Sequence, residues 1–204
     1  DSNLGNRYGI FASNTFTDLV IGGSSPAARN VISGNMSGIH AIAGILKIVV
    51  QGNYIGTDPS GDRAVPNVSG ITISVTIGSD RSVEIGGPGA GEGNVISGNH
   101  WMGIFLDSPI SGTHLIQGNL IGTDATGLKP LGNGGQGISD SSGRAIIGGF
   151  GPSERNVIAY NYGSGVSSGG AIILGNSIHS NYGLGVGGYN LPRAANLTSA
   201  QIVK

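Results

Sequence analysis

The sequence contains no cysteine, few charged residues and few aromatic residues. The lack of cysteine excludes a disulfide framework and the common thiolate zinc sites. Only 10% of the 204 residues are charged, and the ten Lys and Arg leave a formal net charge of −1. The chain therefore lacks the basic surface that a phosphate backbone or an anionic membrane requires, and we expect no nucleic-acid partner.

Long apolar runs are also missing. No stretch approaches the roughly 18 consecutive apolar residues that a spanning helix needs. The first residues do not combine a basic segment with an apolar one, as a secretory signal does. We expect no membrane span, and we expect any targeting signal to have been removed or to lie outside this sequence.

Glycine and branched aliphatic residues are abundant instead. The chain has 40 Gly and 8 Pro, a content that in a charged chain would indicate disorder. Disordered chains are poor in aliphatic residues, however, and 38% of this sequence is hydrophobic. The composition therefore predicts an ordered fold with many turns.

One short motif recurs along the chain. GNYIGTD at 52–58 returns as GNLIGTD at 118–124, and GNVISGN at 93–99 is a related copy. The looser pattern Asn-x-Ile-x-x-(Asn or Asp) matches six times. The copies begin at Asn30, Asn53, Asn94, Asn119, Asn156 and Asn176, and their central residues are Ile32, Ile55, Ile96, Ile121, Ile158 and Ile178.

Each copy belongs to a unit of three short strands. A Gly-aliphatic pair such as Gly38-Ile39 follows each copy, and an aliphatic residue such as Val50 precedes the next one. Repeats of roughly 20–50 residues are typical of solenoids. We predict an all-β, single-stranded parallel β-helix over residues 1–190, with about six to seven coils and three strands per coil. Residues 191–204 are predicted to form a C-terminal tail or a linker to a following segment.

The intervals between copies are uneven because some coils carry insertions at two corners. One insertion follows a Gly-Gly pair and reads SSPAAR, PGAGEG or FGPSER. The other follows the Asp of the motif and predicts two long loops, 59–69 and 125–136. The strands keep their register while the corners vary.

Equivalent residues of stacked coils lie about 4.8 Å apart. We therefore interpret the six Ile as an aliphatic ladder and the six Asn as an amide ladder that bonds both backbone and neighbouring coils. The same alignment places Asp58, Asn99 and Asp124 in one further ladder. The two Asp would then lie about 10 Å apart, which is too far for the carboxylate pair of a glycosidase.

These motifs resemble those of right-handed parallel β-helix repeat proteins of bacterial extracellular and surface type, which repeat NVISGN, GNYIGTD and IGG. The resemblance covers nearly the whole chain and implies a pectin lyase-like fold in an extracellular or cell-surface protein. It does not select a function, because that fold is shared by lyases, hydrolases, epimerases, tailspikes and adhesins. The Asp-rich and Ca²⁺-binding signatures of those enzymes do not occur in this sequence.

Few candidate binding residues remain. Trp101 is able to stack on a sugar ring, and Asp58 and Asp124 are the nearest approach to a carboxylate pair. Asp58 with Asp62 offers oxygen ligands for Ca²⁺, although the second copy has Leu128 at the equivalent position and a plain turn is favoured.

Histidine offers no stronger candidate. The four His are scattered without the spacing of metal ligands: His40, His100, His114 and His179. Asp107 and His114 belong to one coil but lack a third partner. We expect no catalytic residue, no cofactor apart from the Ca²⁺ alternative, and no other metal site.

Three functions remain open. The first is a non-catalytic structural or adhesive β-solenoid, stacking end to end as a fibre subunit or joined to adjoining segments of a longer chain. The second is a polysaccharide-binding or polysaccharide-processing module that uses the two long loops. The third is an ice- or mineral-binding face, which is least favoured because Thr residues such as Thr72 and Thr76 are scattered.

Overall fold

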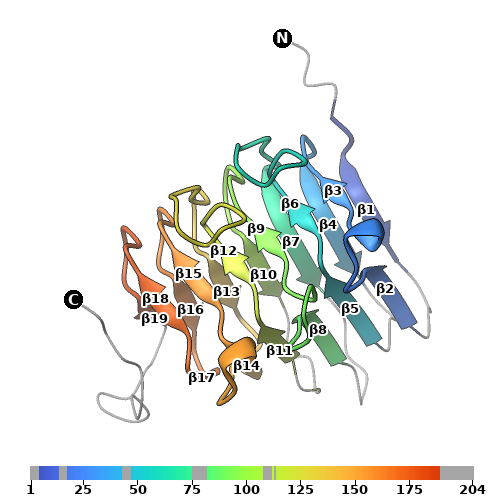
Figure 1. Cartoon of the computed structure of the whole chain (residues 1–204). Coiled ribbons are helices and arrows are strands. Elements are labelled where there is room, and N and C mark those ends of the chain that lie inside the picture. The colour runs from blue at the N-terminus through green and yellow to red at the C-terminus, as the bar shows by residue number, and fades with distance from the viewer. Residues whose placement is uncertain are drawn as a thin grey trace.

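The computed structural model describes residues 5–13, 18–42, 47–74, 82–107, 112 and 114–188. Three parallel sheets wrap around one core and form a rod (Figure 1). The predicted all-β parallel β-helix with three strands per coil is confirmed. Within the described residues, no helix is long and apolar enough to cross a membrane. The predicted tail 191–204 lies outside them.

The strands alternate strictly among the three sheets, so each coil contributes one strand to each. The first sheet contains β1 (Tyr8–Ala12), β4 (Ser37–Ile42), β7 (Ser69–Ser74), β10 (Ile104–Asp107), β13 (Ile138–Asp140), β16 (Val166–Ser168) and β19 (Val186–Gly187). The second contains β2 (Asp18–Gly22), β5 (Lys47–Gln51), β8 (Ser82–Gly86), β11 (His114–Gln117), β14 (Ala145–Gly148) and β17 (Ile172–Leu174). The third contains β3 (Val31–Ile32), β6 (Tyr54–Ile55), β9 (Val95–Ile96), β12 (Leu120–Ile121), β15 (Val157–Ala159) and β18 (Ser177–His179). Coil 1 is β1–β3, coil 6 is β16–β18, and β19 follows coil 6.

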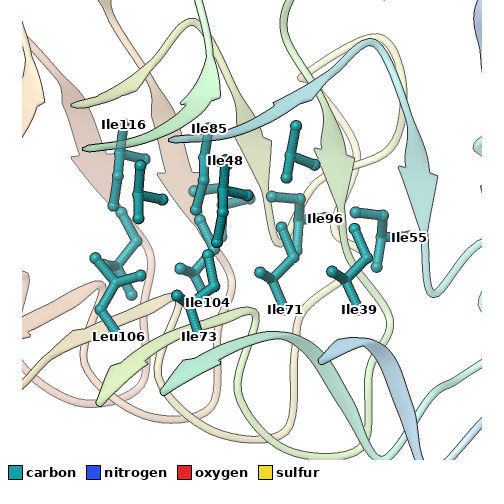
Figure 2. Packing of buried hydrophobic residues seen from close by; sticks show 14 of the residues in the cluster. Ile39, Ile48, Ile55, Ile71, Ile73, Ile85, Ile96, Ile104, Leu106 and Ile116 are labelled. Carbon is teal, nitrogen blue, oxygen red and sulfur yellow. The ribbon is translucent and has the colours of Figure 1, made fainter. Parts of the chain in front are cut away.

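The core is built from stacked aliphatic side chains, because in-register parallel strands place equivalent residues above one another. In the third sheet Ile55 pairs with Ile32 and Ile96, and the column continues through the predicted isoleucines to Ile178. Figure 2 shows the opposed columns of the other sheets meeting in the interior. β-Branched side chains suit such columns because few rotamers are lost on packing.

Glycine fills one whole column where the first sheet begins. It consists of Gly9, Gly38, Gly70, Gly103, Gly137, Gly165 and Gly185. A Cβ at Gly103 would lie 2.7 Å from the carbonyl oxygen of Gly137 and 3.0 Å from Nδ2 of Asn133. Adjacent coils approach so closely here that a side chain would collide with the next coil. This steric limit explains why each Gly-Ile pair of the sequence begins with glycine.

Two asparagine ladders run along the rod. The first asparagine ladder, between the second and third sheets, joins the predicted side chains from Asn30 to Asn176 through Nδ2–Oδ1 hydrogen bonds of 2.8–3.2 Å. The second asparagine ladder lies between the third and first sheets. It contains Asn6, Asn35, Asn67, Asn99, Asn133, Asn161 and Asn181.

The predicted ladder of Asp58, Asn99 and Asp124 is wrong. Asn99 does stand in the second asparagine ladder, but its neighbours there are Asn67 and Asn133. The chain leaves the coil at each Asp and re-enters it only after the loop. The amide that fills the ladder position is therefore the residue that follows the loop, not the one that precedes it.

The loops alternate with a period of two coils. Coils 2 and 4 carry the long loops 58–66 and 124–132, each closed by a bridge, Thr57 with Ala64 and Thr123 with Pro130. These excursions end earlier than the predicted 59–69 and 125–136, because Asn67 and Asn133 already occupy the ladder. Coils 1, 3 and 5 carry the glycine-rich loops 22–29, 86–93 and 148–155, which include η1 (Pro26–Ala28) and η2 (Pro152–Glu154).

Candidate functional site

A groove lies on the outer face of the third sheet, between the two rows of loops. In Figure 1 this sheet faces the viewer, with the long loops above it and the glycine-rich loops below. The groove holds a cavity of about 250 Å³. Tyr54, Val95 and Leu120, the outward residues of three successive strands, line its floor. The volume is slightly below the roughly 300–1,000 Å³ of typical small-ligand pockets, and it suits a unit of one or two rings.

The long loops lean over this floor and touch each other. The backbone N–H of Ala125 donates to the carbonyl of Gly61 at 3.0 Å, which ties together loops from coils two apart. Gly61 lies against the Tyr54 ring, since a Cβ there would be 3.0 Å from Cε2. Gly127 lies against Leu120 in the same way, at 3.1 Å. Ala125 therefore forms the wall of the groove on this side, and Gly61 of the other loop supports it.

Asp58 and Asp124 shape that wall. Oδ1 of Asp124 accepts hydrogen bonds from Thr126 Oγ1 at 2.7 Å and from the backbone N–H of Lys129 at 3.1 Å. Asp58 accepts equivalent bonds from Ser60 and from the Asp62 and Arg63 backbone. Both carboxylates therefore close turns, as the turn chemistry of Asp favours.

The pKa values of both carboxyls reflect these bonds. The hydrogen bond from Ser60 lowers the pKa of Asp58, and the Arg63 and Asp62 N–H groups lower it further. Burial acts to raise the pKa of Asp124, but the bonds from Thr126 and the loop backbone outweigh it and lower the pKa. Within the described residues, no three His, Asp or Glu side chains gather as metal ligands, at Asp58 and Asp62 or elsewhere.

Arg29 places a cation at one end of the groove. Its guanidinium carbon lies 4.1 Å from the centre of the Tyr54 ring, and Nε donates to the carbonyl of Gly52 at 3.1 Å. An arginine held by a ring face and a carbonyl keeps a fixed orientation. The groove therefore combines one oriented cation, one aromatic ring and glycine backbone, which suits a polar ligand.

Trp101 lies outside this groove, at the corner between the third and first sheets. Its indole is half-exposed and covers Gly135, where a Cβ would lie 2.9 Å from Cδ1. His100 beside it is exposed. Sequence reasoning singled out Trp101 but missed two exposed tyrosines on the same corner, although Asn-Tyr-Gly occurs at both 161–163 and 181–183.

The remaining histidines have separate surroundings. His40 packs against Tyr8 and Phe11 on the outer face of the first sheet, and burial lowers its pKa, with a further contribution from Arg7. His179 meets the ring edge of Tyr160 at 5.7 Å. Thr72, from the ice-binding alternative, pairs with His40 in register. Thr76 lies outside the described residues.

His114 does not join Asp107. Asp107 is exposed and accepts a hydrogen bond from Ser74 at 3.4 Å, whereas His114 is fully buried in an aliphatic column next to Val83 and Ala145. Neither ring nitrogen of His114 has a hydrogen-bond partner among the residues that the structure describes. Burial lowers its pKa; Asp140 opposes this effect and Arg144 adds to it.

Asp140 is a buried carboxylate that sequence reasoning missed. It stands at an inward position of the first sheet, in register with Leu106 and Ser168. It accepts hydrogen bonds from the Ser168 hydroxyl at 2.9 Å, from the Ser142 N–H at 3.0 Å and from the Ser142 hydroxyl. The signal available in the sequence was an Asp-Ser-Ser-Gly turn where other coils continue with aliphatic residues.

Comparison of the chain with family models, curated proteins and solved structures finds no match.

Proposed function

We propose that this chain is a non-catalytic, extracellular structural or adhesive β-solenoid that extends by stacking end to end. The observation that carries the proposal is the pair of asparagine ladders, which bond every coil to the next. Every buried asparagine of the described residues belongs to one of them. The buried amides thus follow the rod axis instead of converging on one site.

The carboxylates support the same proposal because local donors already engage them. Glu92 and Glu154 accept the backbone N–H groups of Gly89 and Gly151 at 2.8 and 2.7 Å. Glu84 forms an ion pair with Lys47 at 2.8 Å. Asp58, Asp124 and Asp140 also accept hydrogen bonds within turns, so these carboxylates stabilise the fold. A catalytic acid or base must instead be free to reach a proton of the substrate.

The rod ends favour stacking. Within the described array, β1, β2 and β3 have sheet neighbours on one side only, and so do β17, β18 and β19. A second copy, or an adjoining segment of a longer chain, placed on such an edge continues all three sheets and both ladders. This contact joins two different surfaces and does not close, so it builds filaments.

We expect the purified chain to form rods longer than one copy, with a population that grows with protein concentration. Sedimentation velocity and negative-stain electron microscopy measure this directly. Val31→Pro removes an N–H on the free edge of β3. The bonds that β3 accepts from coil 2 use the carbonyls of Asn30 and Ile32, so they are kept. This variant is expected to shift the population to single rods.

Val31→Thr is the matched control, because it changes the same exposed side chain and keeps the N–H. It is expected to assemble like the parent chain. Single short rods for the parent at every concentration tested would contradict end-to-end stacking.

A second candidate function is polysaccharide binding or processing in the groove. The observation in its favour is the contact between the two long loops over the floor formed by Tyr54 and Leu120, with Arg29 at one end. Loops that are inserted at the corners of the third sheet and fold toward its outer face can enclose a ligand. A protein that serves only as a spacer does not need such loops.

Shortening both long loops is therefore expected to weaken glycan binding at least tenfold. The corner of coil 3, Ser97-Gly98-Asn99, supplies a short replacement from the same chain. Affinity electrophoresis in gels containing polygalacturonate or galactomannan measures binding, and reducing-end release measures processing. A shortened rod that migrates like the parent in every gel would exclude the groove as a glycan site.

A further inference from the structure

Three exposed aromatic side chains share the corner between the third and first sheets. Trp101 is 54% exposed, Tyr162 69% and Tyr182 80%. They follow the asparagines of the second asparagine ladder by one or two residues, in coils 3, 5 and 6. The chain has one Trp and only 5% aromatic residues. Three exposed aromatic side chains at one corner are therefore unusual, and such a group is typical of a binding surface.

Backbone hydrogen bonds join the corner residues along the rod and place Trp101 in register with Gly163 and Gly183, which directly follow Tyr162 and Tyr182. Gly135 donates to the Trp101 carbonyl at 2.8 Å, Gly163 donates to Gly135 at 2.8 Å, and Gly183 donates to Gly163 at 3.0 Å. Each bond advances one coil, or about 4.8 Å, so the row runs parallel to the rod axis. The Tyr162 and Tyr182 rings stack with centroids 5.0 Å apart and planes 11° apart.

Glycines form the surface between these rings. The indole of Trp101 leans over Gly135 toward the tyrosine side of the corner. A Cβ at Gly163 would lie 2.7 Å from the Gln136 backbone nitrogen, so close approach of the coils requires glycine there. The corner therefore presents exposed rings beside bare backbone. We call residues 100–103, 134–137, 162–165 and 182–185 the aromatic strip.

The aromatic strip has no permanently charged side chain. It contains no Asp, Glu, Lys or Arg. Its polar side chains are the Gln136 amide and the Ser164 hydroxyl, which have no hydrogen-bond partner within the described residues, the two tyrosine hydroxyls and the His100 imidazole. An anionic glycan or a nucleic acid would meet no Lys or Arg in the strip, whereas neutral hydroxyl groups would find both donors and acceptors.

We propose that the aromatic strip binds a neutral, extended glycan lying parallel to the rod axis. The C–H groups on the face of a pyranose ring carry partial positive charge and pack against the negative face of an aromatic ring. Trp101 offers such a face in coil 3, and the stacked pair of Tyr162 and Tyr182 offers its outer faces, ring edges and hydroxyl groups in coils 5 and 6. None of these residues lines the groove on the third sheet, so this site is separate from the second candidate function.

The single Trp makes the site observable, because intrinsic indole fluorescence reports on Trp101 alone. Titration with cellohexaose and with chitohexaose is expected to shift the emission of the parent chain in a saturable way. Replacing both tyrosines, Tyr162→Ala with Tyr182→Ala, is expected to raise the half-saturating concentration at least tenfold. The double Tyr→Phe variant keeps the ring faces and is expected to bind within a few fold of the parent.

Phe150→Ala is the control, because Phe150 is 86% exposed in a glycine-rich loop away from the strip. It should leave the titration unchanged, and circular dichroism checks that each variant remains folded. Three results would overturn the proposal: no spectral change with either neutral glycan, equal binding by the double alanine variant, or binding restricted to polygalacturonate and lost in salt. An emission shift caused only by an apolar peptide would also overturn it and would assign the strip to a protein partner.

Discussion

Replacing Asn119 with Asp is expected to destabilise the rod by roughly 3–5 kcal/mol, although the two side chains have the same size. Asn119 is fully buried in the middle of the first asparagine ladder. Its Nδ2 donates to the carbonyl of Ile85 at 2.8 Å, to the carbonyl of Gln117 at 2.9 Å and to Oδ1 of Asn156 at 3.0 Å. A carboxylate has no N–H to donate, so three acceptors would face a buried negative charge.

The position in the ladder supplies the control. Asn30 is the exposed first member, and its Nδ2 makes a single ladder bond, to Asn53. Asn30→Asp is therefore expected to cost only about 1 kcal/mol, the usual value of one hydrogen bond near the surface. Urea unfolding of both variants measures the difference, and lowering the pH should recover part of the loss in N119D as its carboxyl takes up a proton. Equal costs at the two positions would show that the ladder does not carry the stability assigned to it.

The sequence predicted the solenoid because its physical cause is local and repeated. Columns such as Ile32, Ile55 and Ile96 recur at fixed offsets from an Asn, and each offset follows from strand and turn geometry. These fixed offsets determine both the order of the strands and the number of strands in each coil. The glycine column was visible for the same reason, since every copy contains it.

The second asparagine ladder was harder to predict because a loop interrupts its sequence signature. Asp58 and Asp124 satisfy the motif, yet Asn67 and Asn133 fill the ladder. Loop closure costs so little free energy that periodicity does not indicate where the chain re-enters the coil. The hydrogen bonds from Ser60 and Thr126 provide the missing criterion, because an Asp that is followed two residues later by a hydroxyl closes a turn.

The candidate sites were less predictable than the fold because they depend on contacts between coils two apart. The bond between Ala125 and Gly61 joins residues that no short motif relates. The row of Trp101, Tyr162 and Tyr182 depends on which corner each residue occupies, and thus on the positions of Asn99, Asn161 and Asn181 in the ladder. Once the ladder is assigned correctly, the row can be identified from the sequence.

His114→Leu is expected to stabilise the protein, by about 1 kcal/mol near neutral pH and by more in acid. His114 occupies an aliphatic column between Val83 and Ala145, and both of its ring nitrogens are buried with no hydrogen-bond partner in the described part of the chain. Leucine has a similar volume and no polar atom to desolvate. This gain in stability is expected because the native histidine is a polar residue in a column that is otherwise aliphatic.

The acid dependence has a definite sign. Burial lowers the pKa of His114 below its ordinary value of 6.5, and Arg144 adds to this while Asp140 opposes it. Between the lowered pKa and 6.5, the unfolded chain binds a proton that the folded chain does not. Stability contributed by this group is therefore complete above pH 6.5 and decreases as the pH falls through that interval.

Urea unfolding of the parent and of H114L at several pH values tests this linkage. The two curves of free energy against pH should run parallel above pH 6.5 and diverge below it, because leucine takes up no proton. His100→Leu, at an exposed corner position, is the control and should keep the acid sensitivity of the parent. Parallel curves for the parent and H114L down to pH 5 would mean that Asp140 stabilises the protonated ring inside the core. The buried pair would then act as an ion pair, and acid sensitivity would have to arise elsewhere in the rod.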